Sequence, residues 1–181
     1  MALADAIADI ENGFEQLEFA IRLLSACELG KIDPSIVDDA HTVQQPGGML
    51  NFPAGKFATT ERLVRAASIN VLIAAAATAL TLDRGFEVAG IARDPCATDQ
   101  VGMLRLLVYM VRSAYAHDIA SPRWEVRGHF QRQLKLTLEG GDYVIDLTHL
   151  HGQTFTIDDI GGYLNWYRIY RASMSVIKPN P

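Results

Sequence analysis

One stretch of the chain restricts its possible folds more than any other. Residues 66–82 contain no charged side chain and include four consecutive alanines at positions 74–77. A helix with so little polar surface is buried, either in a bilayer or in a protein core. The stretch is shorter than the roughly 20 apolar residues that span a bilayer, and Ser68 and Asn70 make it more polar. We therefore expect a buried core helix and no membrane contact.

Apolar residues at helical spacing predict three helices. A stripe with alternating intervals of four and three residues opens the chain, and Gly30 is expected to end that helix. Thr59 or Thr60 can cap the helix that contains the uncharged stretch, and a third helix is predicted from about Thr98 to His117. The predicted inner faces are Leu3, Ile7, Ile10, Phe14, Leu17, Ile21 and Leu24 in the first helix, Leu63, Ala67, Val71, Ala74 and Thr78 in the second, and Val101, Leu104, Val108, Val111 and Tyr115 in the third.

The segment between the first two helices is predicted to be irregular. Residues 31–57 contain Pro34, Pro46, Gly47, Gly48, Pro53 and Gly55. This density of residues that interrupt regular structure predicts a long loop. Loops of such length in compact domains are often functional or mobile.

After Pro122 the apolar pattern changes from helical to alternating. Leu134, Leu136 and Leu138 alternate with polar residues, Gly140-Gly141 supplies a turn, and residues 143–147 form a second apolar run, which predicts a β-hairpin. Trp124, Val126 and Phe130 are candidates for a third short strand.

A last helix is predicted to end at about Ile177. Thr156 and Asp159 match a capping box, and Phe155 and Ile160 are spaced to pack around it. The sequence therefore predicts a mainly α single domain over residues 1–181. It has four or more helices, and a small β-hairpin in the region of about 124–148 is inserted before the last helix.

Charge and cysteine content narrow the function classes. The net charge of −5 argues against a protein that coats nucleic acid through bulk electrostatics, because such domains are usually basic. Cys27 and Cys96 are too few for a disulfide framework and lack the paired spacing of a zinc ribbon. The opening residues 1–5 lack the basic segment of a secretory signal. We expect a cytoplasmic protein with reduced thiols.

The most informative chemical feature is the segment Arg112-Ser113-Ala114-Tyr115-Ala116-His117, placed at the end of the third predicted helix. With Pro122-Arg123-Trp124 shortly after it, this Arg-x4-His segment resembles the motif of the HEPN superfamily of α-helical bundle proteins. The family commonly has Asn or Asp after the arginine, where this chain has Ser113, and serine can also donate and accept a hydrogen bond. Some members carry a tyrosine that receives a nucleotidyl group two residues beyond the histidine. Ile119 stands there in this chain, so that form of regulation is not expected.

The resemblance implies a HEPN-like helical bundle. Active members of the family are metal-independent endoribonucleases, and they use the Arg and His of two protomers across a dimer interface. It implies a homodimer, RNA as substrate, no metal or other cofactor, and a toxin–antitoxin or defence setting with an antitoxin or other partner protein. Arg112 and His117 are then the catalytic residues. Candidate binding residues beside them are Ser113, Tyr115, Arg123 and Trp124.

The two catalytic candidates have suitable chemistry. Histidine changes charge near neutral pH and acts as a general base or acid, and the arginine fork clamps phosphate and neutralises developing charge. A spacing of five residues places the side chains about 140° apart on an ideal helix. The two side chains converge only if the helix frays before His117 or if a partner chain contributes. One histidine per chain, together with the regular apolar stripe of the first helix, predicts a dimer.

Three alternatives remain open from the residues themselves. Arg112 can pair with a carboxylate and His117 can interact with the helix C-terminus, so that both have structural roles. In a non-catalytic binding or dimerisation module of the same fold, the two residues can instead hold a phosphate, a ligand or each other. The motif can also arise by chance in a structural protein. A basic segment from Arg112 to Lys135 favours a nucleic-acid contact, although its cations equally suit the solvated face of strands. It contains Arg112, His117, Arg123, Arg127, His129, Arg132 and Lys135 against Asp118 and Glu125.

Other candidate groups give weaker signals. His149 and His151 share one side of a strand, but no acidic or cysteine partner lies at a diagnostic spacing for zinc. Asp38-Asp39-x-His41 lies in the predicted loop and is interpreted as surface polarity. Trp166, Tyr167 and Tyr170 can stack on bases, and their commoner role is packing.

Overall fold

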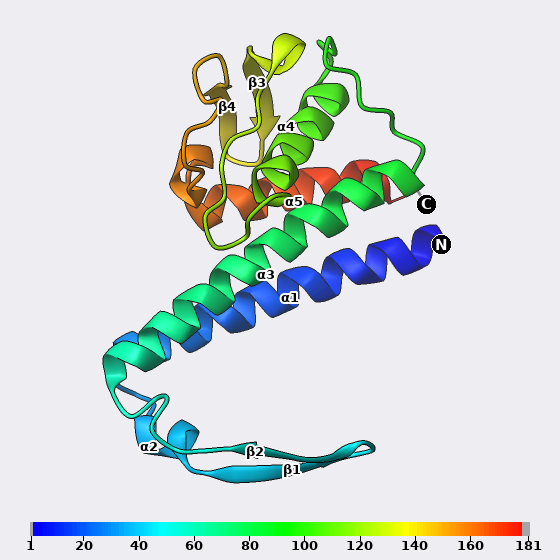
Figure 1. The fold of residues 1–181 in the computed structure, drawn as a ribbon. Helices are drawn as coiled ribbons and strands as arrows, with labels where there is room; N and C mark the ends of the chain where they lie inside the picture. The colour runs from blue at the N-terminus through cyan, green and yellow to red at the C-terminus, as the bar shows by residue number, and fades with distance from the viewer. Residues whose placement is uncertain (1, 179–181) are drawn as a thin grey trace. The chain divides into compact units, whose positions relative to one another are not determined.

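The computed structural model describes residues 2–178 and is mainly helical, with five α-helices and two small β-hairpins in that range (Figure 1). The helices are α1 (Leu3–Glu28), α2 (Pro34–Asp38), α3 (Thr60–Val88), α4 (Gln100–Tyr115) and α5 (Gly162–Ile177), and the strands are β1 (His41–Gln45), β2 (Gly48–Phe52), β3 (Gln133–Leu138) and β4 (Gly141–Asp146). Two short 3₁₀ helices, η1 (Gly128–Phe130) and η2 (Ile157–Ile160), precede β3 and α5 respectively. The predicted mainly α class is confirmed.

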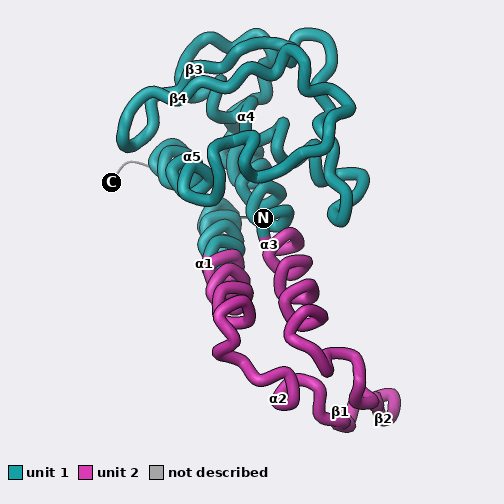
Figure 2. The backbone as a smooth tube through the Cα atoms, turned by 90° about the vertical axis from the view of Figure 1, so that its left-hand side faces the viewer, with its two compact units in different colours: residues 1–14, 75–181 teal, residues 15–74 magenta. Residues whose placement is uncertain are grey.

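The chain forms two compact units (Figure 2). The large unit comprises residues 2–14 and 75–178, and the small unit comprises residues 15–74. The boundaries fall inside α1 and inside α3, so each of these helices contributes to both units. The single-domain organisation over the whole chain stays a prediction.

The core of the large unit is built around α4, which packs against β3 and α5. Leu106, Leu107 and Met110 of α4 are almost completely buried. Val101 was predicted to face inward and is instead exposed, because it lies in the first turn of the helix, next to solvent. The other predicted inner residues of α4 are buried, as expected: Leu104, Val108, Val111 and Tyr115.

An aromatic cluster joins α1 to α5 in the large unit. The ring of Phe14 lies 3.9 Å from that of Tyr170, 5.4 Å from that of Tyr167 and 6.2 Å from that of Trp166. The Trp166 indole nitrogen also donates to the Thr78 hydroxyl at 2.9 Å. Trp166 is fully buried, and Tyr167 and Tyr170 pack on Phe14 while they stay partly exposed. All three therefore have the packing role that was the commoner of their two predicted roles.

The predicted β3–β4 hairpin is present, antiparallel, with Leu138 paired to Gly141. Leu134, Leu136 and Leu138 are buried and alternate with exposed residues. Gly140 and Gly141 have φ angles of 92° and 124°, a region that residues with a side chain rarely adopt. The predicted third strand is wrong, because the segment after Pro122 makes only one isolated bridge, Arg123 to Thr154, before η1.

The start of the last helix follows the predicted capping chemistry. The Asp159 carboxylate accepts the backbone N–H of Thr156 at 2.8 Å, and the capping box is complete. The capping box lies at the start of the 3₁₀ helix η2. Gly161, with a φ of 85°, then changes the direction of the chain before α5. Helix α5 ends at Ile177, as predicted.

The long helix α3 presents the predicted face to the interior. Leu63, Ala67, Val71, Ala74 and Thr78 are all buried. By length and composition α3 could also cross a membrane, and 44% of its most apolar window is buried inside the protein. The cytoplasmic location stays a prediction.

The small unit has its own apolar core, formed where α1 and α3 meet. Cys27, Leu63 and Ala67 are buried together, with Leu23 and Val64 packed beside them. Thr59 caps α3 by accepting the backbone N–H of Arg62 at 3.3 Å, as predicted.

The prediction of an irregular loop over residues 31–57 is wrong in part, because this segment contains α2 and the β1–β2 hairpin. Asp33 caps α2, with Pro34 at its first position, and Pro46-Gly47 forms the turn between the strands. The Asp38 carboxylate then accepts the backbone N–H groups of Gly55 and Phe57 at 2.8 and 2.6 Å. The breaker residues thus serve as caps and turns between short regular elements.

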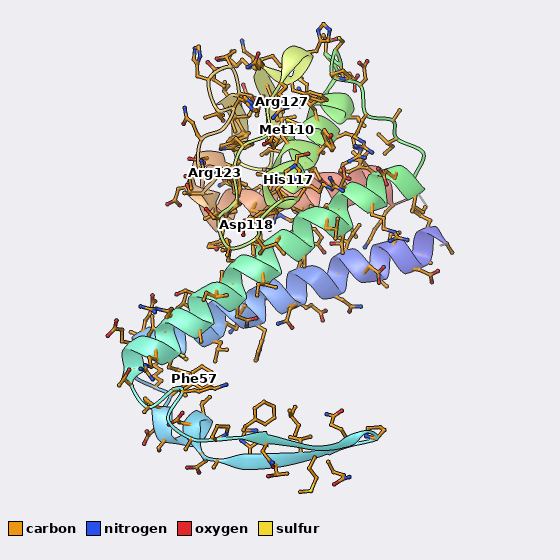
Figure 3. The ribbon with its side chains drawn as sticks, viewed as in Figure 1. Phe57, Met110, His117, Asp118, Arg123 and Arg127 are labelled. Atoms are coloured by element: carbon orange, nitrogen blue, oxygen red, sulfur yellow. The ribbon has the colours of Figure 1, made fainter. Side chains whose placement is uncertain are left out.

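Every residue of β1 and β2 is exposed, as the side chains drawn in Figure 3 illustrate. The register places Val43 opposite Leu50 and His41 opposite Phe52 on one face. Thr42 and Asn51 face the other side and are joined by a hydrogen bond of 2.8 Å. Val43, Leu50 and Phe52 therefore share one face of the hairpin with His41, whereas Met49 lies on the other face.

Candidate functional cleft at the end of helix α4

The end of α4 brings the two motif residues to one cleft. The helix ends at Tyr115, and the backbone N–H of Ala116 closes it with a hydrogen bond of 3.2 Å to the Ser113 carbonyl. His117 therefore lies beyond the helix and is not held at the helical angle of about 140° from Arg112. Both residues line an open cleft of about 360 Å³, together with Met110 and Arg127; Figure 3 labels His117, Met110 and Arg127.

A buried ion pair supports the arginine of the motif. The Arg105 guanidinium donates to the Asp83 carboxylate, and both side chains are almost inaccessible to solvent. The second Asp83 oxygen lies 3.8 Å from the Nε atom of Arg112. Asp83 thereby joins α3 to two arginines of α4, and the Arg112 side chain keeps 37% of its surface exposed.

The Arg112–Asp83 contact bears directly on whether Arg112 is available to a ligand. A distance of 3.8 Å is too long for a hydrogen bond, and the Arg112 Nε atom is buried without a hydrogen-bond partner in the described structure. The Asp83 carboxylate thus orients the Nε end of the Arg112 guanidinium by electrostatic attraction. The Arg112 side chain is partly exposed and lines the cleft, so an anion in the cleft can reach it.

Arg112 also borders a second, larger hollow of about 570 Å³. That hollow is lined by three carboxylates, from Asp9, Asp83 and Glu87, in addition to arginines. The negative charges of these carboxylates repel a phosphate group. The smaller cleft, which contains His117, is therefore the better anion site.

His117 is exposed and is followed by a turn that fixes the chain direction. The Asp118 carboxylate accepts the backbone N–H groups of Ala120 and Ser121 at 2.8 and 3.2 Å. An aspartate that holds such a turn is a common local device. Asp118 therefore stabilises the turn after His117 rather than the cleft itself.

The extended segment after the turn forms the opposite wall. The backbone N–H of Arg123 donates to the carbonyl of Ala114 at 3.0 Å, which ties the segment to the end of α4. Trp124 and Val126 are fully buried, whereas Glu125 and Arg127 alternate with them and line the cleft. This period of two is the ordinary geometry of an extended chain.

Aromatic side chains complete the cleft. The rings of Tyr109 and Phe130 lie 5.6 Å apart with an interplanar angle of 45°. The Arg93 guanidinium lies 4.5 Å above the Tyr109 ring. The cleft thus combines two arginines, a histidine, one carboxylate and two aromatic rings.

The structure separates the sequence-predicted site residues into two groups. Arg112, His117 and Ser113 line the cleft, and Ser113 is buried at its base. Tyr115 and Trp124 belong to the core, where both pack edge-on against Phe155.

The core positions of Tyr115 and Trp124 change their interpretation. Burial raises the pKa of the Tyr115 hydroxyl, with a further contribution from Tyr163, so it stays protonated. The Trp124 indole nitrogen donates to Asp159 at 3.0 Å. Neither residue is among those that line the cleft, and both belong to the core of the large unit.

Arg123 is exposed but points elsewhere, since its guanidinium donates to the carbonyl of Gly152 at 3.2 Å. Glu125, Arg127, Tyr109 and Phe130 line the cleft and were missed as site residues. The alternation of Trp124 and Val126 with Glu125 and Arg127 was the available signal.

The weaker candidates, the His149–His151 pair and the Asp38 segment, belong to no metal-binding group of the described residues. Residues 2–178 contain no group of three or more His, Cys, Asp or Glu side chains able to hold a metal ion. His149 and His151 lie in exposed turns after β4. Asp38 is engaged with the backbone of residues 55–57, and that hydrogen bonding lowers the pKa of its carboxyl group.

Comparisons with protein-family models, with curated proteins and with solved structures gave no match to this chain. The chemistry of the cleft is therefore the basis on which a function is assigned.

Proposed function

We propose that the chain is a metal-independent endoribonuclease of HEPN-like fold, in which Arg112 and His117 carry the chemistry. The single observation that supports this assignment is that both motif residues line one open cleft. The cleft contains Arg127 as a second cation and has two aromatic rings on its wall. Cations for phosphate and aromatic rings for bases are the usual components of a single-stranded RNA site.

The reaction follows from the residues. The 2′-hydroxyl of a ribose attacks the adjacent phosphorus, and an imidazole accepts the hydroxyl proton. Negative charge develops on the phosphoryl oxygens, where the Arg112 guanidinium stabilises it. The bond to the 5′-oxygen then breaks, and a protonated imidazole supplies the proton to that oxygen. The products are a 2′,3′-cyclic phosphate and a free 5′-hydroxyl.

A second copy of the chain supplies the missing acid or base in this proposal. The cleft contains one histidine, whereas the reaction needs a proton acceptor and a proton donor. The apolar stripe of α1 does not provide the interface, because Ile10, Phe14 and Leu17 are buried within the chain. Ile69 and Ile73, one turn apart on α3, are half-exposed and offer an apolar contact for a dimer.

The biological setting is proposed from the same resemblance. A cytoplasmic ribonuclease of this kind would act as a toxin or defence component, with an antitoxin or other partner protein that restrains it. No metal or cofactor is part of the proposal, because the acid, the base and the group that stabilises the developing charge are all side chains.

Cleavage in the presence of EDTA tests the assignment. The wild-type protein should cut single-stranded RNA under these conditions, and His117→Ala and Arg112→Ala should each reduce the rate by about 10²-fold or more. His151→Ala and Arg65→Ala are matched controls, because both residues are exposed and neither lines the cleft. A purified dimer that leaves varied RNAs intact would contradict the proposal.

The second candidate is a non-catalytic module that binds phosphate in the same cleft. The position of Asp83, 3.8 Å from Arg112, favours it, because a neighbouring carboxylate partly neutralises the arginine. This candidate predicts RNA binding that weakens in Arg112→Ala, with no cleavage by any variant.

A further inference from the structure

We propose that the cleft selects guanine, and that Glu125 and Arg127 read the Watson–Crick edge of that base. This inference rests on the proposed function, since it names the base that the same cleft takes. The observation behind it is a paired carboxylate and guanidinium on the wall of a cleft that otherwise suits phosphate.

Glu125 is the only carboxylate among the residues that line the cleft within the described chain. A phosphate-binding site gains nothing from a negative charge, which repels the ligand. Glu125 keeps 31% of its side chain exposed, and one of its oxygens lies 3.2 Å from the Arg127 guanidinium. Glu125 lines the cleft, and its remaining acceptor positions suit uncharged N–H donors.

The Glu125–Arg127 pair presents hydrogen-bond acceptors beside a donor. The Watson–Crick edge of guanine presents two adjacent donors, N1–H and the N2 amino group, beside the O6 acceptor. The two patterns are complementary. Adenine and cytosine place an acceptor beside their amino group, and uracil places its single donor between two carbonyls, so each of these bases sets an acceptor against the carboxylate.

The alternation in the extended segment places Glu125 and Arg127 on the same side of the chain. Buried Trp124 and Val126 hold the backbone, and Trp124 exchanges backbone hydrogen bonds of 2.9 and 2.8 Å with Gln153 and Gly152. The aromatic pair Tyr109 and Phe130 supplies a surface for the base. A volume of about 360 Å³ lies at the small end of ligand sites and suits one nucleotide.

Calorimetric titration of the chain of residues 1–181 with each of the four ribonucleoside 3′-monophosphates tests the inference. Guanosine 3′-monophosphate should bind at least about tenfold more tightly than the other three, which is the discrimination that one bidentate base contact supplies. Glu125→Gln should remove this preference and leave the weaker binding of the other nucleotides. Glu139→Gln, an exposed glutamate in the β3–β4 turn, is the matched control and should retain it.

The outcomes separate this inference from the proposed function. Equal binding of all four nucleotides, no binding of any, or a guanine preference that survives in Glu125→Gln would overturn the base assignment. Cleavage of RNA without base preference would leave the nuclease assignment intact and overturn this one. A guanine preference in a protein that cuts no RNA would support the base site and contradict the nuclease.

Discussion

The buried ion pair beneath the cleft gives a stability prediction whose size follows from the structure. Asp83 and Arg105 keep only 7% and 1% of their side-chain surfaces exposed. Asp83→Asn removes the negative charge while it preserves the shape of the side chain. The Arg105 guanidinium then remains buried, and its nearest carboxylate is Glu87, at 3.6 Å and half exposed.

Removal of one partner from a buried pair typically costs about 3–5 kcal/mol, because the other charge stays uncompensated. Glu87 offsets part of that cost, so we expect a loss of about 3 kcal/mol in the free energy of unfolding. For a chain of this size the loss corresponds to a decrease of about 6–12 °C in Tm. Urea unfolding followed by circular dichroism measures the free energy.

Two further variants make this test specific. Glu139→Gln breaks an exposed pair with Arg171, and exposed pairs contribute less than about 1 kcal/mol. The double variant Asp83→Leu with Arg105→Met removes both buried charges and should recover most of the lost stability. A loss in Asp83→Asn no larger than that in Glu139→Gln would refute the view that this pair carries a buried charge.

Three other predictions concern the hairpin, the small unit and the dimer. Gly141→Val should reduce stability by about 1 kcal/mol or more, because valine is strained at the Gly141 φ of 124°; unchanged thermal unfolding would show that the turn tolerates a side chain. The Asp38 carboxyl has a pKa below its ordinary value of 3.8, chiefly because Phe57 donates a hydrogen bond to it. The contribution of the ionised Asp38 carboxyl to the free energy of unfolding should be complete above pH 3.8 and should be lost as the pH falls through the lowered pKa. Acid titration of Asp38→Asn should lack this component, and identical acid profiles would contradict the assignment. Ile73→Glu should convert the proposed dimer to a monomer in sedimentation while the fold is retained, because Ile73 is exposed in the chain; a monomeric wild-type protein at micromolar concentration would refute the dimer.

Apolar periodicity predicted the helices well because burial in a core selects one face of a helix. The buried faces of α3 and α5 and the alternation in β3 follow directly from that rule. The β1–β2 hairpin was missed because its residues are all exposed, so no core imposes a pattern on them. Its turn residues, Pro46 and Gly47, were noted only as interruptions.

The sequence predicted the two motif residues of the cleft, but it did not predict the residues that form the walls of the cleft. Arg112 and His117 were found because their types and spacing carry chemistry. The contribution of Asp83 depends on tertiary packing, which brings it to Arg105 from another helix. A charge inside an apolar run, as at Arg105, was the one local sign of that pair.

Attack by the 2′-hydroxyl in the cleft is the central step of the proposed mechanism. A labelled RNA oligonucleotide should be cut by the wild-type protein in EDTA to give 2′,3′-cyclic phosphate ends. The same oligonucleotide with 2′-deoxyribose at the cut position should resist cleavage there, because the attacking group is absent. Cleavage of the deoxy-substituted bond, or loss of all cleavage in EDTA, would contradict the proposed mechanism.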